Sequence, residues 1–326
     1  MPEGGVWVSE AEAAELLSLE DAIDVLAGAY RLQAAGAAQS VRRAHVREGE
    51  SILHAVGGTI AGERLSGTKT WTYTPGGAAP LLILFSLDDG RVLGVIEAFA
   101  MGQMRTAATS GLGTRVLARP ESRTLALLGT GKQAFEQARA VAAVRPIERV
   151  RLFGRDADKR GTLAERLRAA LGAEVSEHAD VADAVASADV VTAITRAAEP
   201  ILDGAMLAPG MHVNAVGAIV PSRRELDETA VARADAIVAD SVAQAREDAG
   251  ELRAAADAGR LDWSRVRGLD AVVDTPTDAL RGADDITLFK ALGVGLSDVA
   301  LGAEILRRAH AAGAGSPLPA PAAAHH

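Results

Sequence analysis

The residues whose spacing most clearly suggests chemistry lie between Thr124 and Ala134, where the chain reads TLALLGTGKQA. An apolar stretch runs into Gly129-Thr130-Gly131, and a third small residue, Ala134, follows shortly after. In such a pattern the first glycine permits a tight turn and the second lets the backbone approach a pyrophosphate. The third small residue lets a helix pack on the sheet, and the N–H groups at that helix's start can bind phosphate oxygens. The spacing therefore predicts a dinucleotide-binding turn.

A second pattern concerns the ribose of such a dinucleotide. The next expected strand, 149–153, is followed by Gly154-Arg155. NAD-specific proteins carry an acidic residue near this place to bind the ribose 2′-hydroxyl. Glycine removes that carboxylate, and Arg155, with Lys159 or Arg160 nearby, supplies positive charge for a 2′-phosphate. The sequence favours NADP(H) over NAD(H).

The elements around these residues alternate between apolar and helical sequence. The expected strands are 124–128, 149–153, 190–193, 212–215 and 236–238, and helical stretches such as 133–144 separate them. This alternation predicts a parallel sheet with helices on both faces. Thr195 and the run Asn214-Ala215-Val216-Gly217 end two of these strands, at the edge where ligands bind in such folds.

The first part of the chain follows a different pattern. Ser9 and Ser18 are expected to cap helices within residues 9–35. Short strands with turn residues between them then follow, at 41–46, 51–56, 67–72, 81–86 and 92–96. Their hairpin spacing predicts an antiparallel sheet. A helix over 104–118 is expected to lead into the dinucleotide-binding part, and 298–310 is again amphipathic.

Composition narrows the class of protein. The 326-residue chain has 48% hydrophobic but only 3% aromatic residues and a net charge of −9, which argues against nucleic-acid partners and anionic membranes. There is no cysteine, and the seven histidines are scattered, so we expect no disulfide and no metal site. Neither a membrane-spanning run nor a signal peptide is evident, and a cytoplasmic protein is expected.

Several segments, in order, are similar to those of the ornithine cyclodeaminase/mu-crystallin family over nearly the whole chain. They are SGTKTW around Lys69, MRTAATS (104–110), LLGTGKQA (127–134), HVNAVGA (212–218), PSRRELD (221–227) and DITLFKALG (285–293). The resemblance implies an α/β fold with two domains. Residues 1–113, completed by a helix over 296–312, would form an α+β substrate-binding and dimerisation domain with the antiparallel sheet. Residues 114–295 would form a Rossmann domain, and 313–326 a disordered tail; a homodimer is implied.

The resemblance also implies three catalytic residues. Arg42 would hold a substrate carboxylate in a two-pronged pair, and Lys69 would hydrogen-bond that carboxylate or the reacting nitrogen. Arg105 would reach the cofactor or the carboxylate. An arginine at a helix start opposes the helix dipole, so its expected place there needs such a reason. Thr106 would contact a cofactor phosphate.

The expected cofactor-binding residues come from the resemblance and the strand ends together. They are Arg105, Thr106, Gly129, Thr130, Gly131, Lys132, Gln133, Arg155, Thr195, Asn214, Ala215, Val216 and Gly217.

Two positions depart from the family's pattern. Gly102 stands where members commonly carry threonine. Ile219 stands where the cyclodeaminases carry the aspartate that serves as acid and base for ornithine's amines, and isoleucine cannot move protons. Ornithine cyclodeamination would then need another carboxylate, such as Asp248 or Glu225.

These features predict an NADPH-dependent reductase of cyclic imino acids, converting Δ1-pyrroline-2-carboxylate or Δ1-piperideine-2-carboxylate to proline or pipecolate. The alternatives are an amino-acid or imine dehydrogenase of the alanine dehydrogenase type, an ornithine cyclodeaminase, and a non-enzymatic ligand-binding protein like mu-crystallin.

Overall fold

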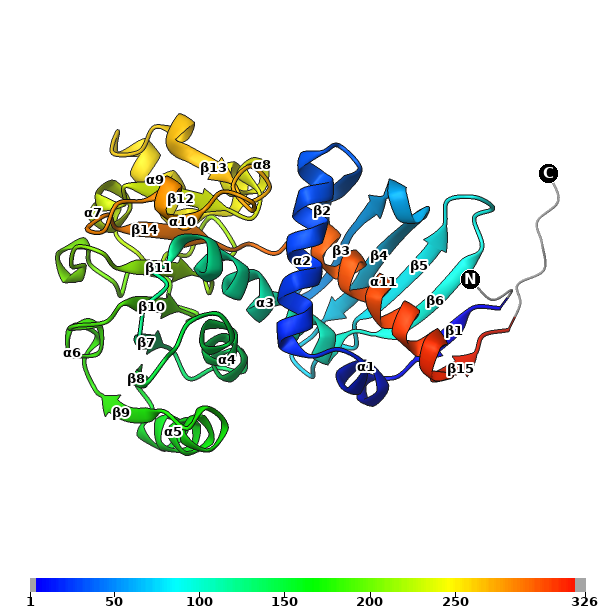
Figure 1. Ribbon diagram of the computed structural model, residues 1–326, viewed down its shortest axis with the longest axis horizontal. Coiled ribbons are helices and arrows are strands. Elements are labelled where there is room, and N and C mark those ends of the chain that lie inside the picture. Colours follow the sequence, from blue (N-terminus) through cyan, green and yellow to red (C-terminus); the bar gives the residue numbers. More distant parts are fainter. Residues whose placement is uncertain (1–3, 320–326) are drawn as a thin grey trace. The chain divides into compact units, whose positions relative to one another are not determined.

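A computed structural model describes residues 4–319 (Figure 1). The chain forms two compact units. The first comprises the chain before Thr106 and after Gly293, and the second comprises Thr106–Gly293. The boundary falls within one helix, α3 (Phe99–Leu117), which runs from the first unit into the second.

A mixed sheet forms the base of the first unit. Among residues 4–319 it has seven strands in the order β15-β1-β6-β5-β4-β3-β2. The bounds are β1 (Val6–Val8), β2 (Ala38–Glu48), β3 (Ser51–Ile60), β4 (Leu65–Tyr73), β5 (Leu81–Ser86), β6 (Val92–Glu97) and β15 (Ser316–Pro317). β2 to β6 form the predicted antiparallel meander, but β1 adds to β6 in parallel, which the prediction lacked. Three residues are too few to show a strand period.

The predicted disordered tail is wrong for its first residues. Gly313 ends the preceding helix in a left-handed conformation, with φ of +66°. Ser316 and Pro317 then pair with β1, and the Leu318 N–H donates to the Gly5 carbonyl at 2.8 Å. Proline is tolerated there because β15 is an edge strand. Residues 320–326 lie outside the described part of the chain.

Helices α1 (Glu10–Leu16), α2 (Leu19–Ala34) and α11 (Gly295–Ala312) complete this unit (Figure 1). The predicted caps are confirmed: Ser9 forms a capping box with Glu12, and Ser18 caps α2. α11 lies against β3 so closely that a Cβ on Gly295 would fall 2.2 Å from the Gly57 nitrogen. Small residues at this contact let helix and sheet backbones touch.

Helix α3 begins at Phe99 rather than at the predicted Met104. The Glu10 carboxylate accepts hydrogen bonds from the Phe99 and Ala100 N–H groups, at 2.5 and 2.7 Å, and so caps the helix from a distant part of the chain. Arg105 therefore lies in the second turn, and the dipole argument for its position at a helix start was wrong.

The second unit contains the predicted parallel sheet. Residues 106–293, all described, form eight strands in the order β13-β12-β14-β11-β10-β7-β8-β9. The bounds are β7 (Thr124–Leu128), β8 (Arg149–Phe153), β9 (Glu174–His178), β10 (Val190–Ala193), β11 (His212–Ala215), β12 (Ala236–Ala239), β13 (Val266–Gly268) and β14 (Thr287–Lys290). The strand order reverses between β7 and β10, which is the switch point of a Rossmann fold.

Short helices connect these strands on both faces (Figure 1). They are α4 (Ala134–Val144), α5 (Ala157–Leu171), α6 (Val181–Val185), α7 (Glu228–Arg233), α8 (Val242–Asp248), α9 (Gly250–Asp257) and α10 (Thr277–Leu280), with the 3-10 turns η2 (Gly204–Met206) and η3 (Trp263–Arg265). A further turn, η1 (Ala61–Glu63), belongs to the first unit. Alanine-rich faces pack on the apolar strands.

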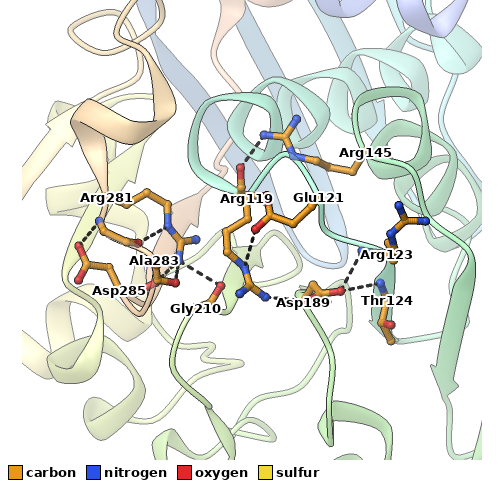
Figure 2. A network of polar contacts seen from close by, with 12 residues as sticks. Arg119, Glu121, Arg123, Thr124, Arg145, Asp189, Gly210, Arg281, Ala283 and Asp285 are labelled. Atoms are coloured by element: carbon orange, nitrogen blue, oxygen red, sulfur yellow. Dashed lines mark hydrogen bonds and ion pairs between the residues drawn. The ribbon is translucent and has the colours of Figure 1, made fainter.

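Buried arginines anchor the end of α3 at the amino edge of this sheet (Figure 2). Arg145 donates to the carbonyls of Arg115 and Ala118, at 2.8 and 2.6 Å. Arg281 donates to the Leu117 and Gly210 carbonyls, at 3.3 and 3.2 Å. Burial lowers the pKa of Arg145 to about 10, which leaves it charged at neutral pH. The carbonyls of Arg115, Leu117 and Ala118 are among those that the end of α3 leaves unpaired, and these guanidinium groups satisfy them.

No helix in the described part of the chain is long and apolar enough to cross a membrane.

Candidate substrate and cofactor sites

Two predicted catalytic residues, Lys69 and Arg105, meet around a carboxylate in the first unit. Lys69 lies in β4, Arg105 in α3, and the carboxylate belongs to Asp298 in the first turn of α11. The Lys69 Nζ is 2.5 Å and the Arg105 Nε 3.2 Å from the same oxygen, Asp298 Oδ1. Their side chains are 6%, 13% and 1% exposed respectively. Asp298 was not among the site residues predicted from the sequence.

The electrostatics of this cluster follow from its burial. Desolvation lowers the pKa of the Lys69 ammonium, and the positive charge of Arg105 lowers it further against the pull of Asp298. Burial acts to raise the pKa of Asp298, but the charges of Arg105 and Lys69 outweigh it and lower that pKa. The cluster therefore holds an ionised carboxylate beside an ammonium that releases its proton more readily than an ordinary lysine.

An aromatic wall adjoins the lysine. The Lys69 Nζ lies 5.2 Å from the centroid of the Trp71 ring, which is stacked on the His54 ring at 4.7 Å. Gly102 lies on another side of the ammonium. A Cβ on Gly102 would fall 3.4 Å from the Lys69 Nζ, and among the described residues no other non-neighbouring atom would lie within 4 Å of it. The absent side chain at Gly102 thus leaves space beside the ammonium.

The predicted carboxylate-binding Arg42 lies in an irregular part of β2. The pairing of β2 with β3 shifts register between Val41 and Ala44, so Arg42 and Arg43 occupy a bulge. Arg42 is exposed and Arg43 is half-buried. The charge of Arg43 contributes to the lowered pKa of Lys69. The structure thus brings Arg43, which sequence reasoning did not choose, into the surroundings of Lys69.

The glycine-rich turn of the second unit has the geometry that phosphate binding requires. Gly129 has a φ of +126°, and a Cβ there would fall 2.5 Å from the Ile194 carbonyl oxygen. A Cβ on Gly131 would meet nothing within 4 Å, and Lys132 is exposed. Gln133 makes no side-chain cap on α4, and its buried Oε1 finds no partner within residues 4–319. The N–H groups at the uncapped start of α4 fit a phosphate group.

Cationic side chains gather after β8, where the sequence predicts the ribose of the dinucleotide. A Cβ on Gly154 would fall 2.4 Å from Thr130 Cγ2, so packing against the glycine-rich turn requires glycine here. Arg155 is exposed and makes no ion pair or hydrogen bond in the described part of the chain. In contrast, Lys159 pairs with the N-cap aspartate of α5, and Arg160 donates to the Gly154 carbonyl at 2.6 Å. Arg155 is the available cation.

The loops that follow β10 and β11 carry the other expected cofactor-binding residues. Ala215 ends β11, Val216 and Gly217 follow it, and Thr195 lies just after β10. Both loops are joined by the fully buried Glu225, whose carboxylate accepts hydrogen bonds from Thr195 and Gly217. Because Glu225 is enclosed and bonded in this way, it is unsuited to replace the missing cyclodeaminase aspartate.

The side chain of Asn214 is engaged inside the sheet. Its Nδ2 donates to the hydroxyls of Thr114 and Thr192, at 2.8 and 3.3 Å, and its Oδ1 lies 3.1 Å from His212 Nε2. His212 Nδ1 lies 2.9 Å from the Thr287 hydroxyl. Any contact that Asn214 makes with a cofactor would therefore come from its backbone.

Sequence reasoning missed the buried charges of Asp298 in GLSDVALG and Lys290 in ITLFKALG, and it named Glu225 in RRELDE only as a carboxylate that could replace the cyclodeaminase aspartate. The available signal was a single charge within or beside an apolar run, which is buried only when it is paired. No group of three metal-ligating side chains occurs among the residues that the structure describes.

Comparisons with known proteins agree with this architecture. Residues 6–313 match the model of the ornithine cyclodeaminase/mu-crystallin family. Two similar proteins are Δ1-pyrroline-2-carboxylate reductases. The one from Paracoccus denitrificans is 34% identical over 74% of this chain and 78% of its own. The one from Bacillus cereus is 30% identical over 72% of each chain.

A similar solved structure is that of the iminosuccinate reductase of Paracoccus denitrificans in complex with NAD+. It aligns with a TM-score of 0.91 and 28% identity, covering 97% of this chain and 100% of its own. The extent of these matches shows that the protein is an oxidoreductase that belongs to the ornithine cyclodeaminase/mu-crystallin family.

Proposed function

We propose that the protein is an NADPH-dependent reductase of cyclic imino acids, forming proline from Δ1-pyrroline-2-carboxylate or pipecolate from Δ1-piperideine-2-carboxylate. The observation that carries the proposal is the buried cluster in which Lys69 and Arg105 share the carboxylate of Asp298. Relatives named as Δ1-pyrroline-2-carboxylate reductases support the substrate class.

The cluster offers partners for both charged groups of an α-imino acid, its carboxylate and its iminium nitrogen. Arg42 or Arg43 on β2, together with Lys69, would bind the carboxylate, since guanidinium and ammonium groups pair well with it. The Asp298 Oδ2, buried and without a partner in the described residues, would accept a hydrogen bond from the ring nitrogen of the iminium form.

Lys69 would also supply the proton that a neutral imine needs. The chemistry that NADPH would supply when bound is a hydride for the imine carbon. The nitrogen then becomes an amine and takes one proton, which Lys69 gives up readily because burial lowers the pKa of its ammonium. Asp298 would hold the ammonium in position before transfer.

The second unit offers the residues that would hold this cofactor. Gly129, Gly131 and the open start of α4 would bind the pyrophosphate, with Thr130, Lys132 and Gln133 beside it. Arg155 would bind the 2′-phosphate, which is the basis for proposing NADPH over NADH. Thr106, Thr195 and the backbone of 214–217 would complete the contacts.

Ornithine cyclodeamination is not expected. Ile219 offers no carboxylate for the distal ammonium of ornithine, and burying that ammonium without a partner is costly. Glu225 is enclosed and already accepts several hydrogen bonds. Ammonia release from ornithine with catalytic NAD would contradict this proposal.

The test is oxidation of NADPH against a panel of substrates: the two cyclic imino acids, and pyruvate and oxaloacetate each with ammonia. We expect turnover with a cyclic imino acid to exceed turnover with the acyclic imines. Faster turnover with pyruvate or oxaloacetate and ammonia would favour an amino-acid dehydrogenase or an iminosuccinate-type reductase instead. Tight NADPH binding without turnover of any substrate would favour a ligand-binding protein.

A further inference from the structure

Glu225 is a fully buried carboxylate that the proposed chemistry does not use. Its Oε1 accepts hydrogen bonds from the Thr195 N–H at 2.5 Å and the Thr195 hydroxyl at 2.8 Å. Its Oε2 accepts from the N–H groups of Gly217 and Ala218, at 2.6 and 3.2 Å. One side chain thus binds the loop after β10 with one oxygen and the loop after β11 with the other.

The two loops touch each other at the same place. A Cβ on Gly217 would fall 2.1 Å from the Thr195 carbonyl oxygen and 2.6 Å from Glu225 Oε1, so only glycine fits. β10 and β11 are neighbouring parallel strands, and their carboxyl ends adjoin the switch point between β7 and β10. Ligands of open α/β sheets bind at this edge.

A second buried charge holds the other end of the same peptide segment. The Lys290 Nζ donates to the Ala218 carbonyl at 2.5 Å and to Glu251 Oε1 at 2.7 Å, and neither charged side chain is exposed. Ala218 is therefore bonded at its N–H by Glu225 and at its carbonyl by Lys290. Buried charges are costly unless paired and hydrogen-bonded, and the Lys290 ammonium meets both conditions, whereas Glu251 Oε2 has no partner among the described residues.

We infer that Glu225 is a positioning residue for the cofactor: its carboxylate fixes the Thr195 and Gly217 loops in the conformation that receives the nicotinamide half of the dinucleotide. The inference rests on the proposed function, which puts the dinucleotide on this unit. Glu225 does not act as an acid or base, because both oxygens accept two hydrogen bonds each and the side chain has no exposed surface. Lys290 supports the same segment.

Glu225→Gln tests the inference, because the amide keeps the side chain's size but offers one acceptor oxygen in place of two. The probes are NADPH and its adenosine half, 2′,5′-ADP, each titrated against the folded protein. We expect the Kd for NADPH to rise about 10- to 100-fold, since hydrogen bonds to a charged acceptor are lost at the loops. The Kd for 2′,5′-ADP should stay within about twofold, because the adenosine end would lie at β8, away from Glu225.

Two further variants keep the test interpretable. Glu225→Asp retains the charge but has one methylene less reach, so it should weaken NADPH binding by an intermediate factor and serves if the glutamine variant does not fold. Glu199→Gln is the matched control, because that side chain is 83% exposed and its partner is the surface Arg224. It should leave both affinities unchanged.

The outcomes separate the inference from the function on which it rests. Wild-type protein that binds neither probe would overturn the proposed function and this inference with it. Wild-type protein that binds NADPH, with a glutamine variant that binds it equally well, would overturn the inference alone. Equal weakening of NADPH and 2′,5′-ADP would also overturn it, because the role of Glu225 would then be general stability.

Discussion

Lys69 carries its ammonium group in buried surroundings that disfavour a charge, and this burial is why we expect it to act as a proton donor. The ammonium is buried against Asp298 and Arg105, and desolvation lowers its pKa from the ordinary value of 10.5. A proton donor with a lowered pKa transfers its proton more easily than an ordinary lysine does.

Replacing Lys69 by alanine should therefore lower kcat about 100- to 10,000-fold, the usual range for losing a general acid. In the wild type, kcat should fall on the alkaline side at a pH below 10.5, as Lys69 loses its proton. Steady-state NADPH oxidation across pH measures both effects. Arg47→Ala, an exposed cation on β2, is the control and should retain activity. A Lys69→Ala variant with normal kcat would remove Lys69 from the mechanism.

We expect Arg155 to govern a different property, the choice between the two nicotinamide cofactors. Its side chain is free for a 2′-phosphate, whereas Lys159 and Arg160 already have partners. Arg155→Ala should reduce the preference for NADPH over NADH about 10- to 100-fold, with NADH binding nearly unchanged. Paired Kd measurements for both cofactors test this. Arg149→Ala, at the opposite end of β8, should keep the preference. Equal affinity of the wild type for both cofactors would refute the assignment.

Residue-level prediction from sequence succeeded where a local pattern carries the chemistry and failed where distant segments meet. The glycine-rich turn is local, and the structure gives Gly129 and Gly131 the geometry expected of them. Asp298 was missed because its partner Lys69 lies more than 200 positions earlier, and nothing local marks a carboxylate that two distant cations neutralise. The link that Glu225 makes between two loops was missed for the same reason, because its partners are distant in the sequence.

At the scale of elements, the apolar periodicity predicted the strands of the second unit that border the glycine-rich turn. β7, β8, β10 and β11 have the predicted bounds. β14 was missed although it lies inside the sheet, because its four residues, TLFK, begin and end with polar side chains. The start of α3 was missed for a different reason: Glu10, the residue that caps it, lies far away in the sequence.

Buried polar groups also link neighbouring elements of the second unit, and His212 is the clearest case. His212 in β11 contacts Thr287 in β14, and through Asn214 it is connected to Thr114 in α3. Desolvation lowers the pKa of this fully buried histidine to about 3, so it is neutral in the folded protein. In the unfolded chain its pKa would be near the ordinary 6.5.

Below about pH 6.5, His212 therefore binds a proton in the unfolded chain but not in the folded protein. The stability of the fold decreases as the pH is lowered from there toward 3. Because of His212 alone, the free energy of unfolding should be about 2 kcal/mol lower at pH 5 than at pH 7. Urea unfolding at both pH values measures the loss. It should shrink in His212→Gln but not in the control His45→Gln, whose side chain is exposed. An equal pH dependence in all three proteins would contradict the assignment.

At the scale of the whole molecule, the sheet of the first unit leaves apolar side chains uncovered. Val41 and Val46 of β2 and Leu53 of β3 are 60%, 67% and 49% exposed. The strand registers put all three on the face opposite Lys69, whereas α11 packs on the Lys69 face. β2 is also an edge strand of the sheet. Exposed apolar groups on one sheet face, next to an open edge, are typical of a surface that a partner covers.

We therefore expect a homodimer with twofold symmetry through this sheet, as the resemblance to the family implied. Light scattering at micromolar concentration should give about twice the chain mass of 33.5 kDa. Val46→Lys combined with Leu53→Lys should shift the protein toward monomer, because two buried ammonium groups per subunit would be unpaired in a symmetric apolar interface. Both side chains are already solvent-exposed in the single chain, so the fold of the subunit should survive the change.

Leu87→Lys is the control: that residue is 39% exposed but lies in the turn after β5, outside the apolar face, and its variant should remain dimeric. A wild type that is monomeric at micromolar concentration would exclude this interface, and a double variant that stays dimeric would move the dimer contact to another surface.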